Sequence, residues 1–225
     1  RTLRHRADVP EAVAESFRLF ETGRPRPAVF NLTLDMLRAP ATVGDARRVR
    51  AERPRARAAD LDAAAKLIDA AERPMVIFGG GCVDCAEEAR AFLAKSGAIA
   101  VTTTAGKGVI ADSDPATLGS SLGSTATQNA LAEADLVIAV GTELAETDSW
   151  TDSLTFHGKL IRIDLDAPTL TRDYAPTVAL LGDAGPTLAA LTERIRAGRK
   201  PDASRIVAIR AANVLEIRPL EWKHI

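Results

Sequence analysis

Two patterns of hydrophobic and polar positions alternate along the chain: short, continuous apolar runs, and longer stretches in which every third or fourth position is apolar. The apolar runs cover residues 75–78, 98–102, 135–141, 159–163 and 178–181. Continuous runs of this length are typical of parallel strands that are buried on both faces of a sheet. The run at 135–141 contains Leu-Val-Ile-Ala-Val, is the strongest of them, and predicts a central strand.

The stretches with helical spacing lie between these runs. They predict helices over residues 60–72, 86–95, 125–133 and 184–196. We expect Asp60 to be the N-cap of the first helix, Ser124 or Thr125 to cap the third, and Gly97 to end the second. Polar, irregular loops are predicted at residues 112–123 and 146–152. Strands that alternate with helices predict an α/β fold with a doubly wound, mostly parallel open sheet of the Rossmann-like type.

A partial α/β segment precedes this domain. Its pattern predicts a helix at residues 9–20 and a strand at residues 28–34, which together are too small to bury a core. Residues 41–58 are rich in Ala, Arg and Pro and predict a solvated linker, although their arginines could also form an anion-binding patch. The sequence therefore divides into residues 1–40, the linker 41–58, a main domain at 59–198, and a closing stretch at 199–225 that starts with helical spacing.

The residues with candidate chemistry follow the predicted strands. In an open parallel sheet, ligands bind outside the carboxyl ends of the strands, so these residues would gather at one edge. They are Gly79, Gly80, Gly81, Lys107, Gly141, Thr142, Asp164 and Asp183. The glycines after the first strand could bind a phosphate or could only allow a tight turn. Both roles stay open because the G-x-G-x-x-G fingerprint is incomplete. Asp164 suits either ribose hydroxyls or a turn cap, and Lys107 either a ligand contact or a solvated loop.

Composition narrows the functional classes. The 225 residues carry a formal net charge of −1, which argues against a nucleic-acid partner, and 46% are hydrophobic, as in a globular protein of one or two domains. No apolar run approaches the ~20 residues that a membrane-spanning helix needs. The chain starts at Arg1 rather than Met and shows no signal peptide, so we expect a cytoplasmic protein whose natural N-terminus is missing.

Cys82 and Cys85 are the only cysteines, and they have C-x-x-C spacing. This spacing suits a redox pair or half of a metal site. Two further zinc ligands would be needed, and the three histidines lie far away in the sequence. The pattern favours two small thiols that pack at the start of a helix in a reducing compartment. No residue is predicted to be catalytic, and no metal site is predicted.

Several motifs, in this order, resemble the thiamine-diphosphate-dependent enzymes of the acetolactate synthase, benzoylformate decarboxylase and oxo-acid decarboxylase group. The motifs are residues 23–32 (GRPRPAVFNL), 73–81 (RPMVIFGGG), 134–142 (ADLVIAVGT), 159–166 (KLIRIDLD) and 181–184 (LGDA). Residues 104–109 and 141–148 are most similar to the 5-guanidino-2-oxopentanoate decarboxylase branch. A generic protein similar to acetolactate synthase is the alternative.

This resemblance implies a function for each part of the chain. Residues 1–40 would be the end of a pyrimidine-binding domain, residues 59–198 the non-catalytic central domain, and residues 199–225 the start of a linker to an absent diphosphate-binding domain. The family's activating glutamate and its Gly-Asp-Gly…Asn motif for Mg²⁺ and diphosphate have no counterpart here. The chain is therefore expected to be a fragment that does not bind thiamine diphosphate by itself, from a parent homo-oligomer that acts on 2-oxo acids with thiamine diphosphate and Mg²⁺.

Other ligands and functions remain as alternatives. Central domains of acetolactate synthase relatives hold FAD, but the family's Arg-Phe-Asp-Asp-Arg segment is replaced here by residues 143–148 (ELAETD), which removes positive charge and disfavours FAD. The alternative function is a nucleotide-binding module for FAD, NAD or ADP. An NAD-dependent deacylase, which shares a similar sheet, would need a zinc-binding cysteine quartet that this sequence lacks.

Overall fold

The computed structural model describes residues 1–40, 52–196 and 199–215. The chain forms two compact units, Arg1–Pro54 and Arg55–Ile225, and each is described by itself. The described parts contain no helix that is both long and apolar enough to cross a membrane. Most of the predicted linker, including Arg47, Arg48 and Arg50, lies outside the described residues, and so does the end of the closing stretch, residues 216–225.

The first unit is a small α/β segment. It contains β1 (Thr2–Leu3), α1 (Asp8–Thr22), β2 (Asn31–Leu32) and α2 (Leu34–Arg38). β1 and β2 pair in parallel, with Thr2 opposite Asn31. The predicted helix at 9–20 is confirmed, but the predicted strand at 28–34 is wrong in extent. It is cut short because Thr33 is the N-cap of α2, and the Thr33 hydroxyl donates a hydrogen bond to the Asp35 carboxylate in the first helical turn.

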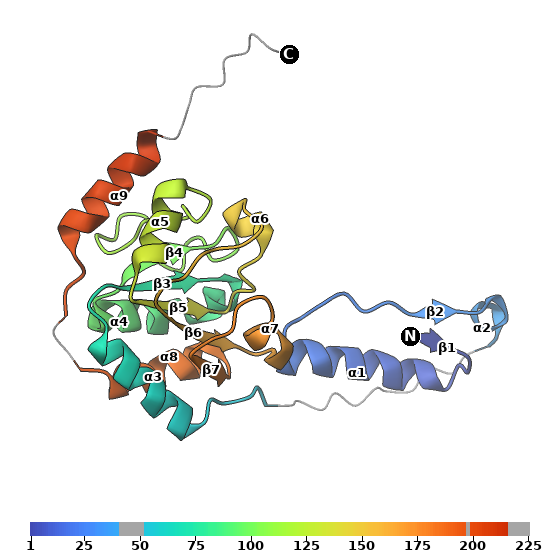
Figure 1. The fold of residues 1–225 in the computed structure, drawn as a ribbon. Coiled ribbons are helices and arrows are strands. Elements are labelled where there is room, and N and C mark those ends of the chain that lie inside the picture. Colours follow the sequence, from blue (N-terminus) through green and yellow to red (C-terminus); the bar gives the residue numbers. More distant parts are fainter. Residues whose placement is uncertain (41–51, 197–198, 216–225) are drawn as a thin grey trace, which may run out of the picture. The chain divides into compact units, whose positions relative to one another are not determined.

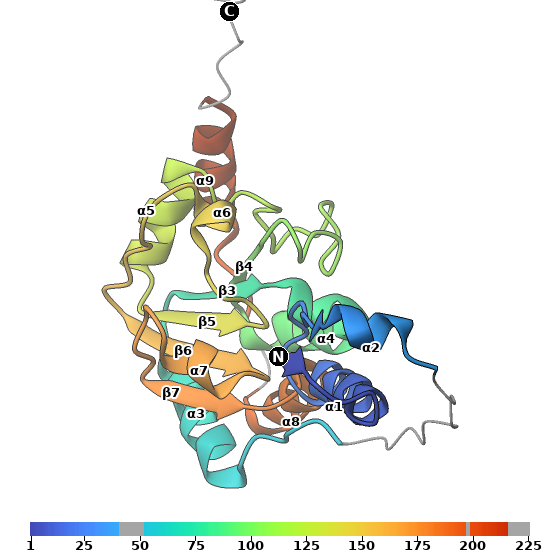
Figure 2. The ribbon, with the colours of Figure 1, turned by 90° about the vertical axis from the view of Figure 1, so that its right-hand side faces the viewer.

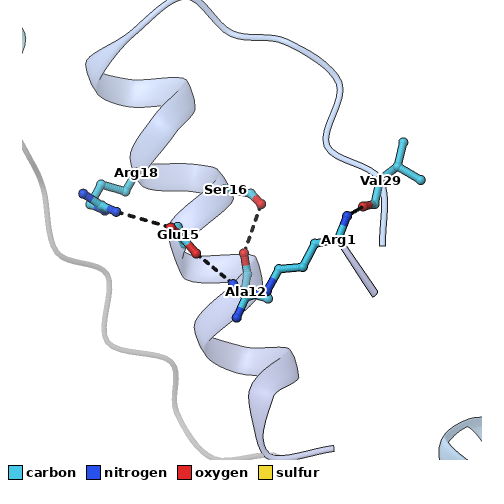
Figure 3. A network of polar contacts seen from close by, with 6 residues as sticks. All are labelled: Arg1, Ala12, Glu15, Ser16, Arg18 and Val29. Atoms are coloured by element: carbon cyan, nitrogen blue, oxygen red, sulfur yellow. Dashed lines mark hydrogen bonds and ion pairs between the residues drawn. The ribbon is translucent and has the colours of Figure 1, made fainter. Parts of the chain in front are cut away.

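Polar contacts connect the parts of this unit (Figure 3). The Arg1 amino group donates to Val29 O at 3.0 Å, and the Arg1 guanidinium lies 2.9 Å from a carboxylate oxygen of Glu15 on α1. Arg18 approaches the same carboxylate at 3.7 Å, and Ser16 Oγ donates to Ala12 O within the helix. Because these ion pairs are exposed, they contribute only about 0–1 kcal/mol each and mainly fix the positions of the strand ends.

The second unit is built on five parallel strands in the order β4-β3-β5-β6-β7. The strands are β3 (Pro74–Phe78), β4 (Ile99–Thr102), β5 (Leu136–Val140), β6 (Lys159–Asp164) and β7 (Val178–Leu181). Every residue of β3, β4 and β5 is buried, and β5 is the middle strand of the order, as its continuous apolar run predicts. The prediction of a doubly wound parallel sheet is confirmed.

Helices cover both faces of this sheet (Figures 1 and 2). One face packs against α3 (Ala58–Ala70), α4 (Ala86–Ser96) and α8 (Ala184–Arg194) through a cluster that includes Val76 and Phe78. The other face packs against α5 (Thr125–Glu133) and α9 (Ala203–Leu215) through a cluster that includes Met75 and Ile77. Successive residues of a strand point to opposite faces, so a continuously apolar strand supplies both clusters.

Shorter helices complete the unit and correct several predictions. A 3₁₀-helix, η1 (Gly80–Cys85), precedes α4, and two short helices, α6 (Glu146–Ser149) and α7 (Ala167–Thr171), follow β5 and β6. The loop predicted at 146–152 is therefore wrong over its first turn. Asp60 is not the N-cap of α3: Arg57 holds that position, and Asp60 forms an ion pair with it at 2.7 Å from the first turn. Gly97 ends α4 in the left-handed conformation, as predicted.

Candidate functional site

The carboxyl ends of the five parallel strands form one edge of the sheet, and the chain reverses its direction of winding there. β4 lies on one side of β3 and β5 lies on the other, so the point between β3 and β5 is the topological switch point where ligands of such sheets bind. Residues 79–81 follow β3, and Gly141 and Thr142 follow β5 at this point. Lys107, Asp164 and Asp183 lie at the ends of β4, β6 and β7 along the same edge.

Backbone contacts fill the switch point. Gly79 N donates to Val140 O at 2.8 Å, and Gly81 N donates to Gly141 O at 3.0 Å. A Cβ atom on Gly79 would overlap Gly141 O and lie 2.6 Å from Thr142 Cβ. Gly141 has a φ of +59°, and a Cβ atom there would lie 2.7 Å from Gly81 Cα. Glycine at these positions therefore lets the turns after β3 and β5 touch each other directly.

Gly80, Gly81 and Lys107 are the exposed members of the predicted set at this point. A Cβ atom on Gly80 would meet only the side chain and backbone of Ala105, the nearest atom being Ala105 Cβ at 3.1 Å. Lys107 lies in the loop after β4, which is closed by hydrogen bonds from Gly106 N to the backbone oxygen and hydroxyl of Thr103. These three residues are the predicted site residues at the switch point that solvent reaches.

The two predicted aspartates have structural contacts. Asp164 is buried, and its Oδ1 accepts a hydrogen bond from Asp166 N at 3.0 Å, which closes the turn between β6 and α7. Of the two roles expected for Asp164, the structure shows the turn cap. Asp183 is the N-cap of α8 by its backbone conformation, and Gly182 N donates to Asp164 O at 2.9 Å, which joins the ends of β6 and β7.

Arg162 is a buried charged residue of this edge that the sequence analysis missed. It lies on β6, is 1% exposed, and donates to Arg172 O at 2.9 Å, Thr142 O at 3.3 Å and Glu143 O at 3.5 Å. One guanidinium thus holds the loop after β5 and the end of α7. The signal was present, because an arginine in the middle of a strand that is otherwise apolar is rarely buried without a specific set of acceptors.

Acidic side chains dominate the charge of this edge. The carboxylates that lie on it or on the loops beside it include those of Glu143, Glu146, Asp148, Asp164 and Asp183. A nucleotide pyrophosphate would meet repulsion from these groups, and Arg162 already donates to backbone carbonyls. Within the described residues, no group of three His, Cys, Asp or Glu side chains is arranged to hold a metal ion. The hydrogen bonds of this edge connect its loops to one another, and its acidic side chains disfavour the binding of a phosphate.

Asp148 on α6 connects this helix to the loop after β4, because its carboxylate accepts a hydrogen bond from the Thr104 backbone. Burial raises the pKa of Asp148 above its ordinary value of 3.8, and the hydrogen bond opposes this only in part. The folded chain therefore holds the proton more tightly than the unfolded chain. This contribution to stability is fully present below the ordinary pKa and is lost as the pH rises through the raised one.

We expect Asp148→Asn to stabilise the second unit at neutral pH, because an amide keeps an acceptor for Thr104 and carries no charge to desolvate. The gain should disappear as the pH falls to 3.8, the ordinary pKa of the carboxyl. Urea unfolding midpoints measured across this range test the prediction. Asp152→Asn, at an exposed position beyond the same helix, is the matched control. Equal pH profiles for the two variants would contradict it.

Comparison with known proteins gives consistent results. The family model "Thiamine pyrophosphate enzyme, central domain" matches residues 61–191. A probable 2-ketoarginine decarboxylase of Pseudomonas aeruginosa is 38% identical over 96% of this chain and 40% of its own length. The acetolactate synthase large subunit of Corynebacterium glutamicum is 30% identical over 85% of this chain and 32% of its own length.

A solved structure shows the same fold. The X-ray structure of a Mycobacterium smegmatis protein that is assigned to the thiamin diphosphate-dependent enzymes matches with a TM-score of 0.69 at 22% identity. The match covers 90% of this chain and 39% of that one. The chain thus spans about two fifths of the length of the decarboxylase and of the solved protein, in agreement with the prediction that it corresponds to part of such an enzyme.

Proposed function

The chain belongs to the thiamine pyrophosphate enzymes, whose central domain it carries, and from this premise we propose that it is the non-catalytic middle part of an enzyme that acts on a 2-oxo acid. The observation that carries the proposal is the 38% identity to the 2-ketoarginine decarboxylase, which extends over 96% of the chain. 2-Ketoarginine is 5-guanidino-2-oxopentanoate. Residues 104–109 and 141–148 resemble the branch of decarboxylases that act on this compound. Carbon dioxide release from this 2-oxo acid is the reaction proposed for the whole enzyme.

The proposed role of the second unit is to space the catalytic domains and to contact a second copy of the enzyme. The rigid five-stranded sheet, with both faces covered, supports the spacing role. Trp150, which is 85% exposed and lies just after α6, supports a contact role, because large aromatic side chains are enriched at protein interfaces. A reducing compartment, the cytoplasm, fits two cysteines that are both free thiols.

Thiamine diphosphate and Mg²⁺ would be held by other parts of such an enzyme. The motif most similar to a metal and diphosphate loop in this chain is Gly182-Asp183-Ala184, and its surroundings do not fit that role. Asp183 starts α8, and a Cβ atom on Gly182 would lie 2.7 Å from Ala56 N, so the loop packs against backbone. A magnesium site needs several oxygen ligands around one point, and the described residues do not provide such a group.

Calorimetry with this chain tests the role of the domain. We expect no heat of binding when thiamine diphosphate and Mg²⁺ are added, whereas the protein encoded by the longest open reading frame that contains the chain should bind them and release carbon dioxide from 5-guanidino-2-oxopentanoate. Pyruvate serves as the comparison substrate, because its turnover to acetolactate would favour the acetolactate synthase alternative. Micromolar binding of the cofactor by the chain alone would contradict the proposal.

Nucleotide binding at the sheet edge is the second candidate function. It is favoured by the position of Gly79, Gly80 and Gly81 at the switch point, with Gly141, Thr142 and Lys107 beside them, and opposed by the acidic groups of the same edge. We expect a colourless protein whose Tm does not change with FAD, NAD or ADP, because a ligand stabilises the fold only if it binds the native state. A shift in Tm that Lys107→Glu abolishes would instead establish a nucleotide site here.

A further inference from the structure

Cys82 and Cys85 lie in η1, directly between the glycine turn after β3 and the start of α4. Both are free thiols, and neither takes part in the function proposed above. Cys82 is fully buried at 0% exposure, whereas Cys85 is 8% exposed. Within the described part of the chain, no metal-holding group of three or more His, Cys, Asp or Glu side chains includes them. Their chemistry is therefore that of a pair of thiols with unequal access to solvent.

The 3₁₀ geometry places the two side chains on top of each other. In a 3₁₀-helix, residues i and i+3 are eclipsed and lie about 6 Å apart along the axis. A disulfide bridges Cα atoms that are about 4.4–6.8 Å apart. Val83 and Asp84, which set this separation, are both within η1. The Cα separation expected for this geometry therefore falls within the range that a disulfide spans, and a hydrogen bond between the two thiols brings their sulfur atoms together.

The environments of the two sulfur atoms differ. A hydrogen bond from Cys82 lowers the pKa of the Cys85 thiol, although burial and the carboxylates of Glu88, Asp183 and Asp84 oppose this effect. The same hydrogen bond, together with burial, raises the pKa of Cys82. Cys82 Sγ also lies 3.5 Å from Val140 O, at the end of β5, which is the alternative acceptor for its single thiol hydrogen. Cys85 thus has the more reactive sulfur, and Cys82 is the protonated partner behind it.

We propose that Cys82 and Cys85 are a reversible oxidation site, at which a small peroxide converts the two thiols to an intramolecular disulfide. Cys85 reacts first: its thiolate attacks one peroxide oxygen, the O–O bond breaks, and a sulfenic acid and hydroxide form, and the hydroxide becomes water with the proton that the Cys85 thiol released. The Cys82 sulfur then attacks Cys85 Sγ, the S–O bond breaks, and water leaves with the proton of Cys82. The two thiols lose two electrons in total, and one hydrogen peroxide becomes two water molecules.

A small oxidant is part of the proposal because of how the site is closed. Gly185, in the first turn of α8, packs against Cys85 so closely that a Cβ atom there would lie 3.1 Å from Cys85 Cβ. Together with the low exposure of Cys85, this contact restricts access to the thiol and disfavours a bulky disulfide reagent. Cys82 Sγ lies 3.5 Å from Val140 O at the end of β5, so the bond forms next to the switch point of the sheet.

Peroxide treatment of the folded full chain, followed by alkylation and mass spectrometry, tests the proposal. The wild-type chain should lose both free thiols and the mass of two hydrogen atoms without forming a disulfide between chains, and dithiothreitol should restore both thiols. Cys82→Ser should accumulate a Cys85 sulfenic acid that dimedone captures. Cys85→Ser should leave Cys82 roughly tenfold or more slower to react with dimedone after peroxide, because its thiol is buried and protonated. Circular dichroism of each variant checks that it is folded.

Three results would overturn the proposal. The first is that both wild-type thiols remain open to alkylation after peroxide treatment. The second is that oxidation yields a disulfide between two chains or a sulfinic acid instead of the internal bond. The third is that dimedone captures Cys82 in the Cys85→Ser chain and not Cys85 in the Cys82→Ser chain. None of these measurements depends on thiamine diphosphate or on turnover, so they are independent of the function proposed above.

Discussion

Gly79→Ala is expected to lower the free energy of unfolding of the second unit by about 3 kcal/mol, the upper part of the range for overpacked sites. The added Cβ atom would overlap Gly141 O and lie 2.6 Å from Thr142 Cβ. The overlap is with backbone, which cannot rotate away as a flexible side chain can. Gly79 has a φ of −98°, which any residue can adopt, so the cost comes from the contact and not from backbone strain.

Gly80→Ala is the matched control, because it adds the same methyl group one residue further along the turn. Its nearest neighbour would be the side-chain atom Ala105 Cβ at 3.1 Å, and Gly80 is exposed, so we expect a loss below about 1 kcal/mol. Urea denaturation followed by circular dichroism measures both variants. If the two substitutions cost the same, the direct contact between the turns after β3 and β5 is not what requires glycine at Gly79.

Arg162→Met should lower the free energy of unfolding by about 2–3 kcal/mol, since hydrogen bonds to a charged donor are strong and their loss leaves buried acceptors unsatisfied. Methionine fills a similar volume, but the carbonyl oxygens of Thr142, Glu143 and Arg172 lose the donor at 2.9–3.5 Å that the guanidinium supplies. The free energy of unfolding of Arg162→Lys should fall between those of the wild type and Arg162→Met. An ammonium keeps the charge but cannot reach all three acceptors as a planar guanidinium does.

Arg172→Ala separates the backbone contribution of Arg172 from its side chain. Arg172 gives Arg162 only its carbonyl oxygen, and the residue is exposed, so the alanine variant should stay within about 0.5 kcal/mol of the wild type. Thermal and urea unfolding of the three variants provide the measurement. An Arg162→Met chain that is as stable as the wild type would mean that the cost of burying the guanidinium cancels the benefit of its hydrogen bonds.

The local pattern of apolar residues was sufficient to predict the strands, because burial in the sheet controls which residue types they contain. The runs at 75–78, 98–102, 135–141, 159–163 and 178–181 all correspond to strands. For β3, β4 and β5 the reason is that every residue is buried, which leaves no polar alternation, whereas β7 lies at an edge of the sheet and is only partly buried. The ends of elements were less predictable. At 28–34 the apolar residues favoured a strand, but Thr33 is the N-cap of a helix that starts at Leu34, and its side chain is hydrogen-bonded to Asp35 in the first turn.

For this protein, the sequence by itself determined the fold class, the family and the edge at which the glycine and aspartate turns gather, because these follow from hydrophobic periodicity and from short motifs along the chain. The tertiary structure alone decided the strand order, the contact of Gly79 with Gly141, and the three carbonyls to which Arg162 donates. The physical reason is that these contacts join turns far apart in the sequence, and their geometry depends on which strands pair and in what register.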